Sequence, residues 1–170
     1  MRSKGLVAVL TLALAACAAP RPRTATRPSK RLSPAEGEFQ KALELYDGVG
    51  LPEPDYEEGF RLFRKAAEGG IVDSHLGYMY EVGQGVPQDE TEAARWYRKA
   101  AEAGQAEAQR RLGILYEEGR GLSGDKVEAY LWLGRAAAQG DLEAAQRRDR
   151  LSAALAPEQL AEAQKRLEAR

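Results

Sequence analysis

The sequence predicts an all-α protein, an α/α solenoid of short helix-turn-helix repeats that follows a disordered N-terminal tether. Matching residues recur 36 positions apart over 71–140, and repetition at a period of about 20–50 residues is typical of stacked repeat arrays. Apolar residues within each copy recur at helical spacing, without the period of two that a strand needs. Paired glycines divide each copy into two predicted helices.

Residues 1–16 have the zones of a secretory signal. Arg2 and Lys4 form a positive start, and a twelve-residue apolar run from Gly5 to Ala16 follows. At about 1.5 Å per residue, such a run is too short to cross about 30 Å of hydrocarbon as a helix. The sequence therefore predicts a signal peptide that is removed, not a transmembrane helix.

The signal ends at Cys17, the single cysteine of the chain. The segment Leu14-Ala15-Ala16-Cys17 resembles the bacterial lipobox, in which the cysteine is lipidated and becomes the first residue after cleavage. This resemblance implies a lipid anchor at Cys17 and a place in the cell envelope. Because Ala18 follows the cysteine, it further implies the outer membrane, with the protein facing the periplasm. An ordinary cleaved signal with an incidental cysteine is the alternative.

Residues 17–34 are predicted to form a disordered, basic, proline-rich tether. They hold four of the eight prolines, five cationic side chains and no acidic residue, a composition that cannot bury a core. The tether either lies against anionic headgroups or acts only as a spacer. Residues 35–170 hold all 26 acidic residues and 18 of the 25 basic ones, a net charge of −8. That balance argues against a nucleic-acid partner, because phosphate binding needs a basic excess.

The segment 35–170 is predicted to be the solenoid itself. Two regular copies of the repeat cover about 71–104 and 105–140, and an earlier, less regular copy covers about 38–70. In that earlier copy the loop is shifted by one residue relative to the others. Residues 141–170 are expected to form C-terminal capping helices, because a polar terminal helix covers the open end of such a stack.

Each copy is predicted to hold two helices joined by a G-x-G turn. Gly77 and Gly113 lie within the first helices, where glycine costs about 0.5–1 kcal/mol relative to alanine, so we expect a neighbouring helix to pack closely against them. The second helices begin with D-x-x-E at Asp55, Asp89 and Asp125. Each Asp is expected to accept from first-turn amides and each Glu to bond the cap amide in return. The second helices are expected to end at left-handed glycines, Gly70, Gly104 and Gly140.

The pattern A-E-A-Q-x-x-L-G-x-x-Y-x-x-G-x-G, followed by D-x-x-x-A-x-x-W-Y-x-K-A-A-x-x-G, resembles the Sel-one-like repeat (SLR) family. That family consists of α/α solenoids related to tetratricopeptide repeats, and the resemblance covers about 38–140. It implies an adaptor or scaffold role with a partner that differs between members. Some cysteine-rich members bind β-lactams or peptidoglycan, but they carry paired cysteines in each repeat, and this chain has only one cysteine.

No residue pattern predicts catalysis, so we expect a protein that is not an enzyme. The G-x-G-x-x-G string at Gly119–Gly124 follows a predicted helix, whereas a dinucleotide site needs a preceding strand. Ser123 has no histidine within its repeat, and His75 is expected to be structural or solvated. With one cysteine and one histidine, neither a metal site nor a cofactor is expected. Four aromatic residues are expected in the core, with an aromatic ligand cage as the alternative: Trp96, Tyr97, Tyr130 and Trp132.

A partner-binding groove is expected along the first helices. By tetratricopeptide-like geometry, nine positions outside the Leu-Gly-Tyr stripe would face it: Gln40, Glu44, Ser74, Tyr78, Glu81, Glu107, Arg110, Ile114 and Glu117. Mixed polar residues around an exposed aromatic ring suit a protein or peptide segment better than a small substrate. The expectation is a lipid-anchored, non-catalytic scaffold. A cell-wall-binding or hydrolase-like SLR protein, or a passive assembly factor, are the alternatives.

Overall fold

Eight α-helices follow one another in residues 31–169, the part of the chain that the computed structural model describes. They are α1 (Pro34–Tyr46), α2 (Tyr56–Glu68), α3 (His75–Val82), α4 (Glu90–Glu102), α5 (Ala106–Glu118), α6 (Lys126–Ala138), α7 (Leu142–Ala154) and α8 (Pro157–Glu168). The described residues contain no strand, so the predicted all-α class is confirmed. The predicted signal peptide and Cys17 lie outside the described residues.

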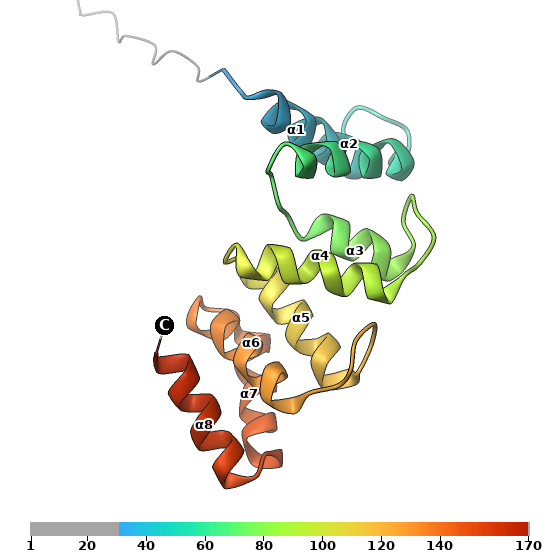
Figure 1. Ribbon diagram of the computed structural model, residues 1–170. Helices are drawn as coiled ribbons and strands as arrows, with labels where there is room; N and C mark the ends of the chain where they lie inside the picture. Colours follow the sequence, from blue (N-terminus) through green and yellow to red (C-terminus); the bar gives the residue numbers. More distant parts are fainter. Residues whose placement is uncertain (1–30, 170) are drawn as a thin grey trace, which may run out of the picture. The chain divides into compact units, whose positions relative to one another are not determined.

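Consecutive helices pack as hairpins that stack in chain order (Figure 1). Helix α1 packs on α2, α3 on α4, and α5 on α6, while α4 packs on α5 and α6 on α7. The last helix, α8, packs on α6 and covers the end of the stack. None of the helices between Pro34 and Glu168 has the length and apolar character that a membrane span requires.

The glycines within the first helices allow the two helices of a hairpin to approach closely. A Cβ atom at Gly77 would lie 2.6 Å from Cδ1 of Tyr97, and one at Gly113 would lie 2.7 Å from Cγ of Leu133. Both distances are far below van der Waals contact. The predicted close packing at these glycines is therefore confirmed, and in both hairpins the residue that fills the space comes from the second helix.

The second glycine of each regular turn forms the contact between successive repeats. Gly121 has a φ of +68° and lies so close to α4 that a Cβ atom there would be 2.0 Å from the carbonyl oxygen of Glu90. Gly85 has the same φ, and a Cβ atom there would be 2.2 Å from the carbonyl oxygen of Tyr56. The turn of one repeat thus packs directly on the first turn of the preceding second helix.

The caps of the second helices differ from the prediction in one respect. Asp55, Asp89 and Asp125 accept first-turn amides at 2.8–3.1 Å, as expected. The predicted hydrogen bond from each cap amide to the glutamate side chain three residues later is wrong. Each cap amide instead donates to a backbone carbonyl near the end of the preceding first helix, as Asp89 N does to Tyr80 O at 3.0 Å. The hairpin itself satisfies the amide, which leaves the glutamate free to pair with an arginine, as Glu92 does with Arg95.

Most of the aromatic side chains predicted to be core are buried. Tyr97, Tyr130 and Trp132 belong to the hydrophobic core, whereas Trp96 is half-buried. The ring of Trp96 carries the ammonium of Lys99 at 4.0 Å from its centroid. The guanidinium of Arg135 lies over the ring of Trp132 in the same way, at 4.2 Å. The aromatic residues of the second helices therefore hold the hairpins together, and both tryptophan rings also make a cation–π contact.

Candidate functional site

The first helices α1, α3, α5 and α7 meet along one face, which we call the first-helix face. Two of its seams are joined by the same ion pair 36 residues apart. Arg111 of α5 pairs with Glu81 of α3 at 3.5 Å, and Arg147 of α7 pairs with Glu117 of α5 at 3.1 Å. The repeat period thus places one arginine between each of these two pairs of neighbouring first helices.

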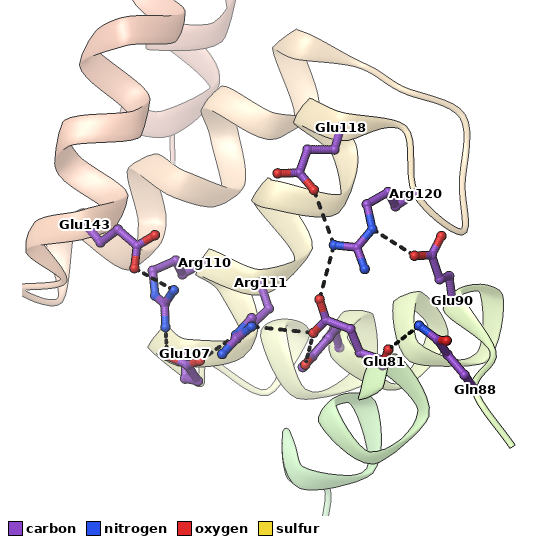
Figure 2. Close-up of polar contacts among 10 residues, drawn as sticks. Glu81, Gln88, Glu90, Glu107, Arg110, Arg111, Glu118, Arg120 and Glu143 are labelled. Carbon is purple, nitrogen blue, oxygen red and sulfur yellow. Dashed lines mark hydrogen bonds and ion pairs between the residues drawn. The ribbon is translucent and has the colours of Figure 1, made fainter. Parts of the chain in front are cut away.

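Helix α5 extends this pairing into a network (Figure 2). The carboxylate of Glu107 accepts from both Arg110 and Arg111. Arg110 also reaches the next repeat, where it donates to Asp141 at 3.0 Å and to Glu143 at 2.8 Å. Burial of Glu107 opposes its ionisation, yet the hydrogen bonds from the two arginines are strong enough to lower its pKa below the usual carboxyl value.

Glu81 is the most enclosed carboxylate of the network, with 10% of its side chain exposed. Besides Arg111, it pairs with Arg120 at 3.3 Å and accepts the hydroxyl of Tyr97 at 2.7 Å. Burial and the bond to Glu81 raise the pKa of Tyr97. Because each oxygen of Glu81 already has a donor, this residue supports the face and leaves little capacity for a ligand.

The seam between α1 and α3 is built differently. Tyr46 occupies the place of Glu81. The Tyr46 hydroxyl donates to Gln84 at 3.1 Å, and Glu81 pairs with Arg120, the residue 36 positions after Gln84. His75 occupies the place of Arg111 and lies edge-on to the Tyr46 ring, with centroids 5.3 Å apart. The Tyr46 and His75 rings therefore stand where the other two seams have an ion pair.

His75 is held firmly in this position. Its ring stacks on Phe63 with centroids 5.0 Å apart, and its Nδ1 contacts the carboxylate of Asp73. Asp73 is largely buried, which opposes ionisation, but hydrogen bonds from His75 and Gln105 lower its pKa. The expectation that His75 is structural is thus supported by its contacts, although one edge of the ring remains accessible at a pocket.

The pocket lies beside the seam between α1 and α3 and has a volume of about 260 Å³. Its lining comes from α1, α4, α5 and the start of α3: Tyr46, Ser74, His75, Tyr78, Tyr97 and Glu107. The lining is mainly aromatic, with the carboxylate of Glu107 and the hydroxyl of Ser74 as polar groups. Ser74 stands 36 residues before Arg110 and His75 stands 36 residues before Arg111. The pocket therefore opens where the next repeat has two long cationic side chains.

The predicted groove residues have unequal surroundings. Ser74, Tyr78 and Glu107 line the pocket, whereas Glu81, Arg110 and Glu117 are occupied by the ion pairs described above. Gln40 and Glu44 are exposed on α1 and share a 3.5 Å hydrogen bond, and Ile114 is half-buried. Sequence reasoning missed Tyr46 and His75 as pocket residues. The signal for Tyr46 was the one-residue shift of the first copy, which aligns Tyr46 with a glutamate and not with a tyrosine. The signal for His75 was its place 36 residues before Arg111.

The sequence features weighed for metal or nucleotide chemistry can be located in the structure. Within residues 31–169, no group of three or more His, Cys, Asp or Glu side chains is arranged to hold a metal ion. The glycine string Gly119–Gly124 connects α5 to α6 and has a helix before it, which does not match a dinucleotide site. Ser123 lies exposed in the same loop.

Known proteins share this architecture. The Sel1 repeat family model matches residues 35–71, 74–105 and 106–141. A crystal structure of a Sel1 repeat protein from Oxalobacter formigenes has a TM-score of 0.62 and 40% identity, covering 69% of this chain and 89% of that one. A protective antigen of uropathogenic Escherichia coli with an SLR fold has a TM-score of 0.59 and 38% identity, covering 62% of this chain and 23% of that one.

Two further relatives are more distant or only partly covered. The cysteine-rich protein B of Helicobacter pylori shares the fold at a TM-score of 0.54 and 20% identity, over 67% of this chain and 96% of that one. An uncharacterized protein of Neisseria meningitidis serogroup B is 39% identical over 67 residues, which are 38% of this chain and 14% of that protein. Three consecutive repeat matches and a shared fold lead to one conclusion: this chain belongs to the Sel1 repeat family.

Proposed function

We propose that this protein is a lipid-anchored scaffold of the bacterial cell envelope whose first-helix face binds a protein or peptide partner. Sel1 repeat proteins are helical scaffolds that generally mediate protein interactions. The observation that carries the proposal is the pocket between Tyr46 and Tyr78, located where the repeating ion pair is interrupted. A regular array presents a continuous paired surface, so an interruption with accessible rings is a place for a partner to bind.

The rest of the face supports binding and not chemistry. Three of the four carboxylates that sequence reasoning placed in the groove, Glu81, Glu107 and Glu117, are paired with arginines. A general base needs a lone pair that can reach a substrate proton, and these oxygens are already hydrogen-bonded. The Sel1 repeat is generally a non-catalytic scaffold fold. A rigid, charged frame around a small aromatic pocket is suited to recognition.

The proposed location follows from the N-terminal sequence. Cys17 lies at the end of a lipobox-like segment, and a basic stretch of residues follows it before the first helix begins. Lipidation of this cysteine would hold the repeats at the outer membrane on the periplasmic side. More than one acyl chain gives a stable anchor, because each buried CH₂ contributes about 0.8 kcal/mol.

Site-specific crosslinking in intact cells tests the partner. A photoreactive residue at position 78, in the pocket, should capture a partner in the membrane fraction, and the same residue at exposed position 123 should not. Tyr78→Ala should reduce the amount of partner recovered with the full chain, with Ser123→Ala as the matched control. Absence of a crosslink specific to position 78 would contradict the proposal. Sedimentation of the protein with purified peptidoglycan would instead indicate a cell-wall binder.

A further inference from the structure

Two of the three seams between successive first helices hold an arginine in the described chain. Arg111 lies between α3 and α5, and Arg147 lies between α5 and α7. At the seam between α1 and α3, His75 stands in the corresponding place and is turned toward Phe63 and Asp73. The first seam therefore has a histidine where each of the other two has an arginine.

The second seam shows what a guanidinium does on this face. Arg111 lies over the ring of Tyr78, with its central carbon 5.4 Å from the ring centroid, while its nitrogens reach carboxylates of two helices, Glu81 and Glu107. Stacking on a ring and bonding to carboxylates at the same time is the geometry that arginine favours over lysine. The pocket is lined by the Tyr46 and Tyr78 rings and by Glu107, whose carboxylate is about half exposed. Glu107 already accepts from Arg110 and Arg111, and its two oxygens have further lone pairs for a third donor.

The charge of the array is also concentrated at this end. Residues 35–104 hold 15 acidic and 7 basic residues, a net charge of −8, whereas residues 105–170 hold 11 of each. Four of the six residues that line the pocket belong to the second repeat: Ser74, His75, Tyr78 and Tyr97. The half of the array that supplies most of the pocket is therefore acidic, and a net charge of this sign raises the local concentration of a basic partner.

We propose that this pocket receives an arginine side chain from an exposed basic segment of the partner. The guanidinium lies with its plane against the Tyr46 or Tyr78 ring, as Arg111 lies over Tyr78 at the second seam, and its nitrogens bond the remaining lone pairs of the Glu107 carboxylate. The inference rests on the proposed function, because it names the chemistry by which a protein partner would be recognised. An apolar or aromatic side chain in the pocket would be a different mode, and the experiment below separates the two.

The test uses the full chain in detergent and three blocked tripeptides as probes: acetyl-Gly-Arg-Gly amide, the same peptide with citrulline, and the same peptide with phenylalanine. Citrulline keeps the shape of arginine and removes its charge. Aromatic resonances of Tyr46, Tyr78 and His75 are followed by NMR during each titration. We expect the arginine peptide to shift these resonances with an affinity about two- to fivefold higher than that of the citrulline peptide, from the strength of an exposed cation–π contact. We also expect its binding to weaken as salt is added. Equal binding of both peptides, stronger binding of the phenylalanine peptide, or no shift at all would overturn the proposal.

A self-filling variant provides the second test. Ser74→Arg restores the arginine that the next repeat has at position 110, and the Ser74 side chain makes no cap bond that the change would break. We expect it to fold as the wild type does and to lose arginine-peptide binding, because its own guanidinium occupies the pocket. Ser123→Arg adds the same charge in an exposed loop and should bind as the wild type does. Unchanged binding by Ser74→Arg would refute the assigned pocket.

The same variants separate this inference from the proposed function. If the partner crosslinks to position 78 in cells and Ser74→Arg abolishes capture, both proposals are supported. If capture is unaffected by Ser74→Arg, the scaffold function holds and the arginine mode of recognition is wrong. If no partner is captured at all, the scaffold function fails regardless of how the isolated peptides bind.

Discussion

A single methyl group added at Gly121 should disrupt the contact between the second and third repeats. Gly121 and Gly119 lie in the same turn with the same φ of +68°, so alanine at either position must adopt a left-handed conformation. That conformation costs about 1–2 kcal/mol, and the reduced freedom of the unfolded chain offsets about 0.4–1 kcal/mol of it. At Gly119 the nearest atom to the added Cβ is 3.6 Å away, an ordinary contact. Gly119→Ala should therefore lower the free energy of unfolding by about 1 kcal/mol.

At Gly121 the added carbon would also be 2.0 Å from the carbonyl oxygen of Glu90, which belongs to the backbone and cannot rotate away. Separating the two repeats enough to relieve that overlap should cost a further 1–3 kcal/mol or so, the usual range for overpacking. Urea unfolding followed by circular dichroism at 222 nm on both variants measures the difference directly. If Gly121→Ala is no less stable than Gly119→Ala, the turn does not pack against the backbone of α4 as closely as the 2.0 Å distance implies.

Three other outcomes are expected. Gly113→Val, whose Cβ would lie 2.7 Å from Cγ of Leu133, should lower the free energy of unfolding by about 1–3 kcal/mol; a melting temperature near that of the wild type would contradict the close-packing account. The ion pairs of Glu107 stabilise the fold above the ordinary glutamate pKa of about 4.3, and this stabilisation should be lost as pH falls through the lower pKa of Glu107 in the folded protein. In Glu107→Gln, the urea midpoint should therefore depend less on pH in the acid range than in the wild type. Cys17→Ser should abolish lipidation and release the protein from membranes; unchanged membrane partitioning would refute the anchor.

Much of the fold is readable from the sequence because the solenoid is built from local rules applied repeatedly. Asp89 and Asp125 precede second helices and cap them, and Gly77 and Gly113 mark the positions where a hairpin closes tightly. These features depend on residues within one repeat or its neighbour. The capping glutamates were misjudged because a tertiary contact, the cap amide bonding to Tyr80 O in the second repeat, satisfies the amide first.

The candidate site was harder to predict because it depends on an irregularity. Alignment by residue type pairs Tyr46 with Tyr80, whereas in the structure the hydrogen bonds place it with Glu81. A shift of one residue on a helix turns a side chain by about 100°, which is enough to move a ring from the core stripe to the first-helix face. The ion pairs of Arg110 join residues about 30 positions apart in the chain, a relation that spacing within one repeat does not show.

The unlike seams give the array joints of two kinds. The joints beside α5 add ion pairs to their apolar packing, and dissolved ions weaken those pairs. The joint between Tyr46 and His75 adds ring contacts, which ions leave intact. Rising ionic strength should therefore remove a small part of the stabilisation of the later joints and less of the first. The response of the stack to the surrounding medium is thus unequal along its length.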